Sequence, residues 1–385
     1  MENRIAEIAG KKQRLVIGLM SGTSADGTDA ALMRLEGAGL ETRWEMLRFI
    51  TIPHRAEIRA RMLNLMHADA GEICRMNFII GRIFGEAALA LAKEAGISID
   101  DVDVIGSHGQ TAYHIDTPDE RATLQIGEAA IIAEMTGRVV ISDFRTGDIA
   151  AGGKGAPLVP FADFVMFRHP KKIRAMQNIG GIANLTVLPA SLDEVTAFDT
   201  GPGNSLIDEA MRQVTGGKMD YDKDGAFATR GKVDRPLLEK LLALPYFAQS
   251  PPKTTGKENF GKDFVKGLMA ENPRMREEDL IATLTMLTGE SIARAYERFV
   301  FPKHKVEEIF VSGGGARNPV IMSRLAERLA PVPVKTTDEL GMPVDAKEAA
   351  AFAILANQTI CGRPSNVPSA TGASRAVILG KITLP

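Results

Sequence analysis

The apolar positions of the chain fall into two similar sets, one near the N-terminus and one near the middle. Each set consists of three apolar runs rich in β-type residues and joined by tight turns, a pattern typical of strands. The first set is Leu15–Met20, Ala30–Leu35 and Trp44–Ile52, and the second is Ile173–Asn178, Ile182–Leu188 and Val195–Phe198. The order of elements repeats although the residues do not, which predicts a duplicated architecture.

Helical periodicity alternates with short buried runs after each set. Helices are predicted at Phe78–Ala95, Ala129–Met135, Asn204–Thr215 and Leu280–Phe301, and strands at Val102–Ile105, Val139–Ser142 and Ile309–Val311. This alternation predicts an α/β protein with mixed β-sheets flanked by helices. Because 385 residues exceed the usual size of one core, we expect two domains with a cleft between them. The Gly- and Pro-rich segment Asp148–Pro160 is either the crossing between the domains or a long surface loop.

The turn that follows Leu15–Met20 is built almost entirely of small residues. Its sequence from Ser21 to Asp29 is SGTSADGTD. Glycines let the backbone approach a ligand, and unpaired amides can form an anion-binding nest. The alternative is a structural hairpin turn, but such a turn needs only one or two residues of this kind. We therefore expect phosphate binding at this loop.

Four further Gly-rich turns follow apolar runs. They are SHGQT at Ser107–Thr111, NIGGIAN at Asn178–Asn184, DTGPGN at Asp199–Asn204 and SGGGARN at Ser312–Asn318. Strand ends in open α/β sheets are where ligands bind, so several such turns suggest a nucleotide laid across a cleft. Gly313–Gly315, ahead of a helical segment, suits adenosine or its phosphates. The nearest approach to a P-loop, Gly147–Gly155, has the wrong spacing.

Two carboxylates are candidates for chemistry. Asp199 follows a strand and precedes glycines that leave room, so it could accept a proton from a hydroxyl or water. Its alternative role is to cap the helix that begins near Asn204, although Asn204 or Ser205 could do so instead. Glu348 starts an Ala-rich helix, where it could act in chemistry or only complement the helix dipole.

Histidine and arginine add weaker candidates. His108 lies in a loop that could face a ligand, whereas His54, His67, His169 and His304 are expected to be solvated surface residues. Arg145 could bind a carboxylate or phosphate as a fork, or form a surface ion pair with Asp143 or Asp148.

Composition narrows the class of protein. Hydrophobic residues make up 45% and charged residues 24%, as in ordinary globular proteins. A formal net charge of -2 provides no basic excess for nucleic acid or an anionic membrane surface. The N-terminus lacks the apolar stretch of a signal peptide, and no run is long enough to span a membrane. Cys74 and Cys361 lie in no metal or redox spacing and are expected to be buried thiols, so we expect a cytoplasmic protein.

Read together, these motifs resemble one family. The stretches GLMSGTSADGTD, GSHGQT, TLQIGE, SDFR, GAPLVP, NIGGIANL, FDTGPGN, YDKDG, SGGGARNP and SATGAS occur in order from about Leu15 to Ser374. They resemble the anhydro-N-acetylmuramic acid kinase family, of the sugar kinase, actin and heat-shock ATPase superfamily. The resemblance implies two ribonuclease-H-like domains with a nucleotide cleft between them. We expect a first domain at 1–147 plus about 360–385, and a second at 148–359.

The resemblance also implies an activity and its participants. The family phosphorylates 1,6-anhydro-N-acetylmuramic acid with ATP and Mg²⁺ and opens the anhydro ring, giving N-acetylmuramic acid 6-phosphate for cell-wall sugar recycling. Asp199 matches the catalytic base, and Glu348 matches a second acidic residue near the reacting oxygen; both are expected at the metal. His108, Gln125, Arg145 and Asp199 are expected to bind the sugar, and the protein is expected to be a homodimer.

The residues expected to hold the nucleotide come from all the Gly-rich loops but SHGQT. They are Gly22, Thr23, Ser24, Ala25, Asp26, Gly27, Thr28, Asp29, Asn178, Gly180, Gly181, Asn184, Gly201, Gly203, Gly313, Gly314, Gly315 and Asn318.

Two departures from the family pattern concern the sugar side. Thr146 and Gly147 follow Arg145 where some members carry arginines, and Lys154 stands where Gln is commoner. Lys154 could supply the missing charge for the lactyl carboxylate. A kinase for an anhydro-sugar without that group, such as levoglucosan, is the first alternative. A nucleotide-binding ATPase or scaffold that phosphorylates no sugar is the second.

Overall fold

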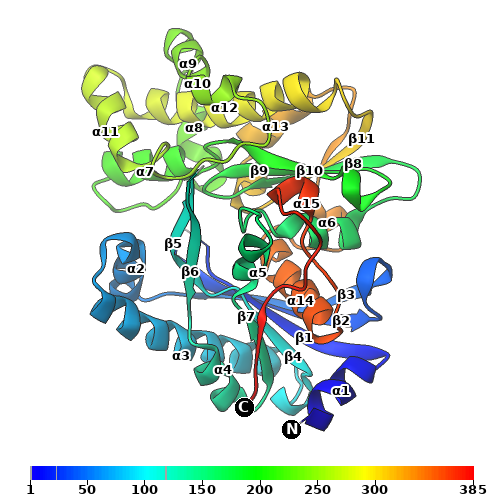
Figure 1. Cartoon of the computed structure of the whole chain (residues 1–385). Coiled ribbons are helices and arrows are strands. Elements are labelled where there is room, and N and C mark those ends of the chain that lie inside the picture. The colour runs from blue at the N-terminus through cyan, green and yellow to red at the C-terminus, as the bar shows by residue number, and fades with distance from the viewer. Residues whose placement is uncertain (1, 23, 118) are drawn as a thin grey trace. The chain divides into compact units, whose positions relative to one another are not determined.

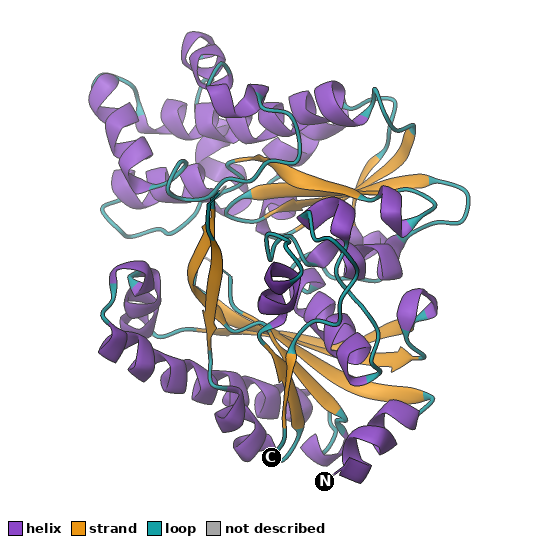
Figure 2. Cartoon of the chain, in the orientation of Figure 1, coloured by secondary structure: helices purple, strands orange, loops and turns teal. Residues whose placement is uncertain are grey.

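The computed structural model describes residues 2–22, 24–117 and 119–385, and the chain divides into two compact units (Figure 1). Unit 1 comprises Met1–Phe167 and Ala346–Pro385, and unit 2 is the continuous segment Arg168–Asp345. Each unit has its own mixed sheet with helices packed against it, as the colouring by secondary structure shows (Figure 2). The α/β class predicted from the apolar pattern is confirmed.

The elements of unit 1 are divided between the two ends of the chain. Its strands are β1 (Gln13–Met20), β2 (Gly27–Glu36), β3 (Arg43–Pro53), β4 (Val104–Ser107), β5 (Gln110–Asp116), β6 (Arg121–Ile126), β7 (Val139–Ser142) and β13 (Lys381–Thr383). Its helices are α1 (Glu2–Gly10), α2 (Ala56–Leu63), α3 (Ala70–Glu94), α4 (Ala129–Thr136), α5 (Phe144–Ala150), α6 (Val159–Phe167), α14 (Lys347–Ile360) and α15 (Pro368–Thr371).

The elements of unit 2 come from one continuous stretch of the chain. Its strands are β8 (Ile173–Ile179), β9 (Ala183–Leu188), β10 (Thr196–Gly201), β11 (Val306–Ser312) and β12 (Val334–Thr336). Its helices are α7 (Ser205–Val214), α8 (Ala226–Arg230), α9 (Arg235–Leu242), α10 (Pro245–Ala248), α11 (Lys262–Glu271), α12 (Glu277–Ala295) and α13 (Pro319–Arg328).

Strand order reveals the duplication directly. The sheet of unit 1 runs β3-β2-β1-β4-β7, with β13 added at the β7 edge, and the sheet of unit 2 runs β10-β9-β8-β11-β12. In both, the first three strands along the chain pair antiparallel, and the remaining two continue parallel to the first. The repeated element order predicted from the sequence is therefore confirmed, as expected for ribonuclease-H-like folds.

Alternate residues of β1 face different helices. Ile17 and Leu19 belong to a buried cluster with Ile80 and Phe84 of α3. Gly18 faces α14, since a Cβ there would lie 1.8 Å from the carbonyl oxygen of Ala349. Successive strand residues point to opposite faces, so α3 and α14 cover opposite sides of the sheet.

The chain crosses between the units at positions other than those expected. Asp148–Pro160 lies within unit 1, and the crossings fall at Phe167/Arg168 and Asp345/Ala346. Asp148 is fully buried there, accepting hydrogen bonds from Asn366 Nδ2 and Thr371 Oγ1 at 2.8 Å each. These bonds tie the Gly-rich segment to the C-terminal part of the same unit.

Other details also differ from expectation. α3 begins at Ala70, eight residues before the predicted start, because Asp69 caps it by accepting from Glu72 N. The ribbon of β5 and β6 was not predicted. Cys74 is exposed and Cys361 half-buried, so the expectation of buried thiols was wrong. No described helix combines the length and hydropathy needed to cross a bilayer.

Candidate functional site

A row of polar side chains crosses the sheet of unit 2. Asp199 on β10 pairs with Asn184 on β9, Asn184 pairs with Asn178 on β8, and Asn178 pairs with Ser312 on β11. Residues directly opposite in antiparallel strands share a face of the sheet. Ser312 Oγ donates to Asn178 Oδ1 at 3.3 Å. Asp199 thus lies inside β10, and not directly after a strand as predicted, because the pairing with β9 extends beyond the apolar run Val195–Phe198. Asn184 lies in β9, within the strand predicted at Ile182–Leu188.

The three Gly-rich turns of unit 2 meet where this row ends. The backbone N–H groups of Asn204 and Ser205 donate to Gly180 O and Gly181 O, at 2.7 and 3.0 Å. Gly313 adopts φ +81°, and a Cβ on Gly315 would lie 2.2 Å from Ile179 Cγ2. The three turns are therefore neighbours in the folded unit.

Gly203 is the tightest point of this junction. A Cβ there would lie 2.3 Å from Gly180 O and 3.0 Å from Ala183 N. We expect Gly203→Ala to push the β8–β9 turn away and to lower the melting temperature of unit 2, whereas Gly314→Ala, with 3.7 Å to its nearest neighbour, should change it little. Thermal unfolding of the two variants checks this; equal melting temperatures would contradict it.

Asn318 has a structural role in this junction. Its side chain caps α13, accepting from Val320 N at 3.0 Å and Ile321 N at 3.4 Å. Its predicted place on the adenosine side remains an expectation.

Asp199 is not a helix cap. Its Oδ2 accepts from Thr255 N at 2.9 Å, and its main-chain oxygen accepts from the Tyr246 hydroxyl at 2.7 Å. Burial raises the pKa of Asp199 to about 7, opposed by the Thr255 N–H and by the positive charge of Lys253. A carboxyl group with this pKa exchanges protons readily near neutral pH.

The first Gly-rich loop of unit 1 is shorter than predicted. Gly27, Thr28 and Asp29 belong to β2, and Thr23 lies outside the described residues. In the loop itself, Ser24 Oγ donates to Asp26 Oδ1 at 2.7 Å, and Ala25 adopts φ +50°.

His54 and Gln110 support this loop from two sides. His54 Nε2 lies 2.8 Å from Thr28 Oγ1 and its Nδ1 lies 3.1 Å from Ala25 O. Gln110 Nε2 donates to Gly22 O at 3.4 Å. The expectation of a solvated His54 was therefore wrong, because strand β3 returns it to the loop from far along the chain.

The buried His108 and the half-buried Arg145 form a pair in unit 1. Nδ1 of His108 lies 2.9 Å from Gly109 O, so it must carry the proton, and Nε2 then accepts from Arg145 Nη2 at 2.9 Å. Burial and the Arg145 charge lower the pKa of His108 to about 3. Arg145 Nη1 also donates to Gly155 O at 2.9 Å. Arg145 thus contacts His108 and Gly155, and no ion pair with Asp143 or Asp148 is found among the described residues.

The neutral state of His108 predicts acid sensitivity. Its folded pKa lies below the unfolded value, so its contribution to stability is present above pH 6.5 and is lost as the pH falls toward 3. Between pH 7 and pH 5 this loss should be about 2 kcal/mol. We expect His108→Asn to be less stable at pH 7 but to lose less stability on acidification. Denaturant unfolding at both pH values checks this; parallel losses in both proteins would contradict it.

Glu348 lies near the same pair. It occupies the first turn of α14 and is half-buried. Burial raises the pKa of Glu348, while the charges of Lys347 and Arg145 lower it. Glu348 belongs to unit 1 and Asp199 to unit 2, so each unit supplies one of the two predicted carboxylates.

The other sugar-side candidates are held by neighbours. Gln125 on β6 donates to Thr123 Oγ1 at 2.7 Å, and its buried Oε1 has no hydrogen-bond partner among the described residues. Lys154 pairs with Asp116 at 3.3 Å, so its charge is already partly compensated. No cluster of three or more His, Cys, Asp or Glu side chains suited to a metal occurs in the part of the chain that the structure describes.

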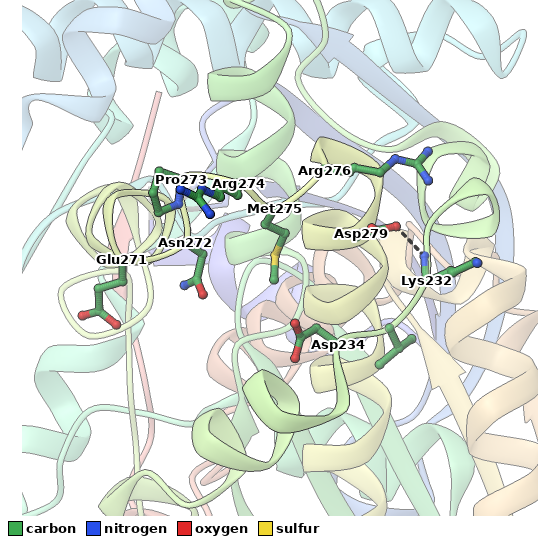
Figure 3. A pocket seen from close by; sticks show the side chains of 10 residues that line it. Lys232, Asp234, Glu271, Asn272, Pro273, Arg274, Met275, Arg276 and Asp279 are labelled. Carbon is green, nitrogen blue, oxygen red and sulfur yellow. Dashed lines mark hydrogen bonds between the residues drawn. The ribbon is translucent and has the colours of Figure 1, made fainter.

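A large open cavity of about 730 Å³ lies elsewhere in unit 2 and contains none of the predicted site residues (Figure 3). Its polar groups serve the local fold: Asp279 Oδ1 accepts from Lys232 N at 2.7 Å, and Asp234 caps α9. We therefore assign it no function.

Three residues beside Asp199 were missed by sequence reasoning. They are Tyr246 on α10 and, in the loop that follows, Lys253 and Thr255, all about 50 residues along the chain from Asp199 and in no motif quoted above. Burial, with Arg298 nearby, lowers the pKa of Lys253 to about 8.

Comparisons with known proteins cover almost the whole chain. Residues 14–385 match the family model for anhydro-N-acetylmuramic acid kinase. A protein of that name from Caldanaerobacter subterraneus subsp. tengcongensis is 49% identical over 395 residues, covering 99% of this chain and all of the relative. Another from Bacillus thuringiensis subsp. konkukian is 43% identical, covering 96% of this chain and 99% of the relative.

A solved structure resembles the chain only distantly. The activator of 2-hydroxyisocaproyl-CoA dehydratase from Clostridium difficile, with bound ADPNP, covers 90% of this chain at 14% identity and a TM-score of 0.45. This likeness is too weak to bear on ligand or mechanism. The family match and the near full-length relatives establish that the chain belongs to the anhydro-N-acetylmuramic acid kinase family and is an enzyme of the kinase class.

Proposed function

We propose that this enzyme uses ATP to phosphorylate 1,6-anhydro-N-acetylmuramic acid and opens its anhydro ring, giving N-acetylmuramic acid 6-phosphate. The observation that carries the proposal is Asp199, a carboxyl group with a pKa near 7 beside Gly-rich turns, in a chain of this family. The substrate comes from the names of the full-length relatives.

The Gly-rich turns suit the phosphates and adenosine of ATP. An added Cβ at Gly22, Gly180 or Gly314 meets nothing closer than 3.7 Å, so the backbone there is accessible, whereas Gly313 and Gly315 allow close backbone packing. We infer that the Gly22–Asp29 loop and the turns at Asn178–Asn184 and Gly201–Gly203 hold the phosphates, and that Gly313–Asn318 holds adenosine. Asp199 and Glu348 supply the oxygen donors that Mg²⁺ prefers, and the metal would neutralise phosphate charge.

The chemistry follows from the structure of the sugar. O6 is held in an acetal with C1, so it has no proton to lose. Asp199 takes a proton from a water molecule, and the water oxygen attacks C1. The C1–O6 bond breaks, and the electron pair left on O6 attacks the γ-phosphorus of ATP, which releases ADP. Phosphoryl transfer itself requires mainly alignment and charge stabilisation.

The sugar side is assigned to unit 1. Arg145, held by His108, provides a cation for the lactyl carboxylate, and Gln125 provides an amide for ring substituents. Glu348 assists proton movement near O6. We further infer a cytoplasmic homodimer, from the family resemblance and the sequence composition.

Product analysis in ¹⁸O-labelled water tests the proposal. With ATP, Mg²⁺ and 1,6-anhydro-N-acetylmuramic acid, mass spectrometry should find one added phosphoryl group and one labelled oxygen at C1. Phosphorylation of levoglucosan instead would show that the substrate is an anhydro-sugar without the lactyl group. ATP binding without either product would favour the non-kinase alternative.

Gly22→Val tests the phosphate loop. A Cβ at Gly22 would have Ser24 Oγ as its nearest neighbour beyond the adjacent residues, at 4.0 Å, so we expect the fold to tolerate the larger side chain and ATP phosphates not to. We expect the variant to lose the ATP-induced stabilisation, about 2.7 kcal/mol at a hundredfold excess over Kd. Gly10→Val, also in open space, is the matched control. Equal ATP-induced stabilisation of the two variants would show that the loop is not part of the nucleotide site.

A further inference from the structure

The edge strand that carries Asp199 is covered by a segment from another part of unit 2. β10 is the outermost strand of its sheet. The segment Lys253–Thr255, here called the strap, lies between α10 and α11, and Lys253 O accepts from Asp199 N at 3.1 Å. Edge strands present unpaired backbone groups. The strap provides a hydrogen-bond acceptor for one of them, the N–H of Asp199.

The strap also holds the carboxylate itself. Thr255 N donates to Asp199 Oδ2 at 2.9 Å, and the Tyr246 hydroxyl donates to Asp199 O at 2.7 Å. The N–H, the main-chain oxygen and one carboxylate oxygen of Asp199 are therefore all engaged. No residue that the structure describes donates a hydrogen bond to the other carboxylate oxygen, Oδ1.

Aromatic packing fixes the strap in place. Lys253 is 5% exposed; its Nζ donates to Tyr246 O at 3.2 Å and lies 4.6 Å from the Tyr246 ring centre and 5.0 Å from that of Phe299. The Tyr246 ring packs edge-on against Phe260 with centroids 5.6 Å apart. These contacts restrain both donors that hold Asp199.

We propose that Thr255 and Tyr246 are positioning residues that orient Asp199 so that Oδ1 is the oxygen that takes the proton. This inference rests on the proposed function, in which Asp199 is the base. Proton transfer needs a donor and an acceptor at hydrogen-bond distance and in line. A carboxylate anchored through Oδ2 can rotate little, so Oδ1 keeps one direction.

Two variants distinguish the role of the Thr255 N–H from that of its side chain. Thr255→Pro deletes the donor, and we expect kcat to fall about 10²-fold, as for an angstrom-scale misplacement of a catalytic group, while KM for ATP and sugar stays within about twofold. Thr255→Ala keeps the N–H and should retain at least half of the wild-type kcat. If the strap had only a structural role, Thr255→Pro would lower stability and raise KM, and kcat would not fall alone.

Tyr246→Phe provides an independent test, because it removes only the hydroxyl and keeps the ring contacts. We expect kcat to fall about tenfold, the loss expected for one hydrogen bond, with KM unchanged; this variant decides the matter if Thr255→Pro does not fold. If Thr255→Pro matches Thr255→Ala, or Tyr246→Phe retains full kcat, the inference is overturned. Turnover by the wild-type enzyme and its loss in Asp199→Asn report on the proposed function separately.

Discussion

Asp199→Asn should lower the rate of sugar phosphorylation by about 10²- to 10⁴-fold, the usual contribution of a general base. The amide has nearly the shape of the carboxylate but cannot accept the proton of the attacking water. Its surroundings should tolerate the change, because Thr255 N can still donate to the side-chain oxygen that replaces Oδ2. ATP binding, measured as ligand-induced stabilisation, should persist because the Gly-rich turns are unaltered.

Asp193→Asn is the matched control for this variant. Asp193 is an exposed carboxylate six residues before Asp199. Its replacement should leave kcat and ATP-induced stabilisation near those of the unaltered enzyme. Near-normal turnover in Asp199→Asn, with the control unchanged, would show that Asp199 is not the general base.

Lys347→Met should destabilise unit 1 by about 3–5 kcal/mol, the cost of removing one partner of a buried ion pair. Lys347 Nζ donates to both carboxylate oxygens of Asp163, at 3.0 and 3.2 Å, and the side chains are 3% and 1% exposed. The pair joins α14 to α6, next to the two points where the chain leaves and re-enters unit 1. Thermal unfolding should show a decrease on the order of 10 °C.

Two comparisons isolate the buried charge as the cause. Lys240→Met breaks the exposed pair with Glu271 and should cost less than about 1 kcal/mol. Lys347→Met combined with Asp163→Leu removes both charges and should recover most of the lost stability. A double variant as unstable as Lys347→Met alone would show that the cost comes from packing and not from the charge.

The sequence was informative wherever periodicity was local. The strand β1 and the Gly-rich turns after β1, β8 and β11 were predicted within a few residues, because strand runs and turn residues act over short distances. α6 was missed because Val159–Phe167 is buried along almost its whole length, so it lacks an amphipathic period. That omission placed the first crossing about twenty residues too early.

The candidate site residues were named from motifs in the sequence, whereas the residues that contact them in the fold were not predicted. Asp199 and Arg145 stand in recognisable contexts, but nothing in the sequence near Tyr246 or Thr255 indicates contact with a residue about 50 positions earlier. His54 was misjudged for the same reason: its partners at Ala25 and Thr28 are brought to it by the pairing of β2 with β3. Pairings between distant segments depend on the whole fold and not on local pattern.

The discontinuity of unit 1 sets an order for folding during synthesis. Unit 2 is one uninterrupted stretch, so all its strands have been synthesised before α14 is made. Gly18 and Gly106, whose lack of Cβ admits α14 at close range, belong to a sheet face that α14 can cover only after residue 360 has been translated. Because domains fold as units as the chain emerges, unit 2 is expected to fold first, and unit 1 is expected to complete its fold only when its C-terminal segment, Ala346–Pro385, has been made.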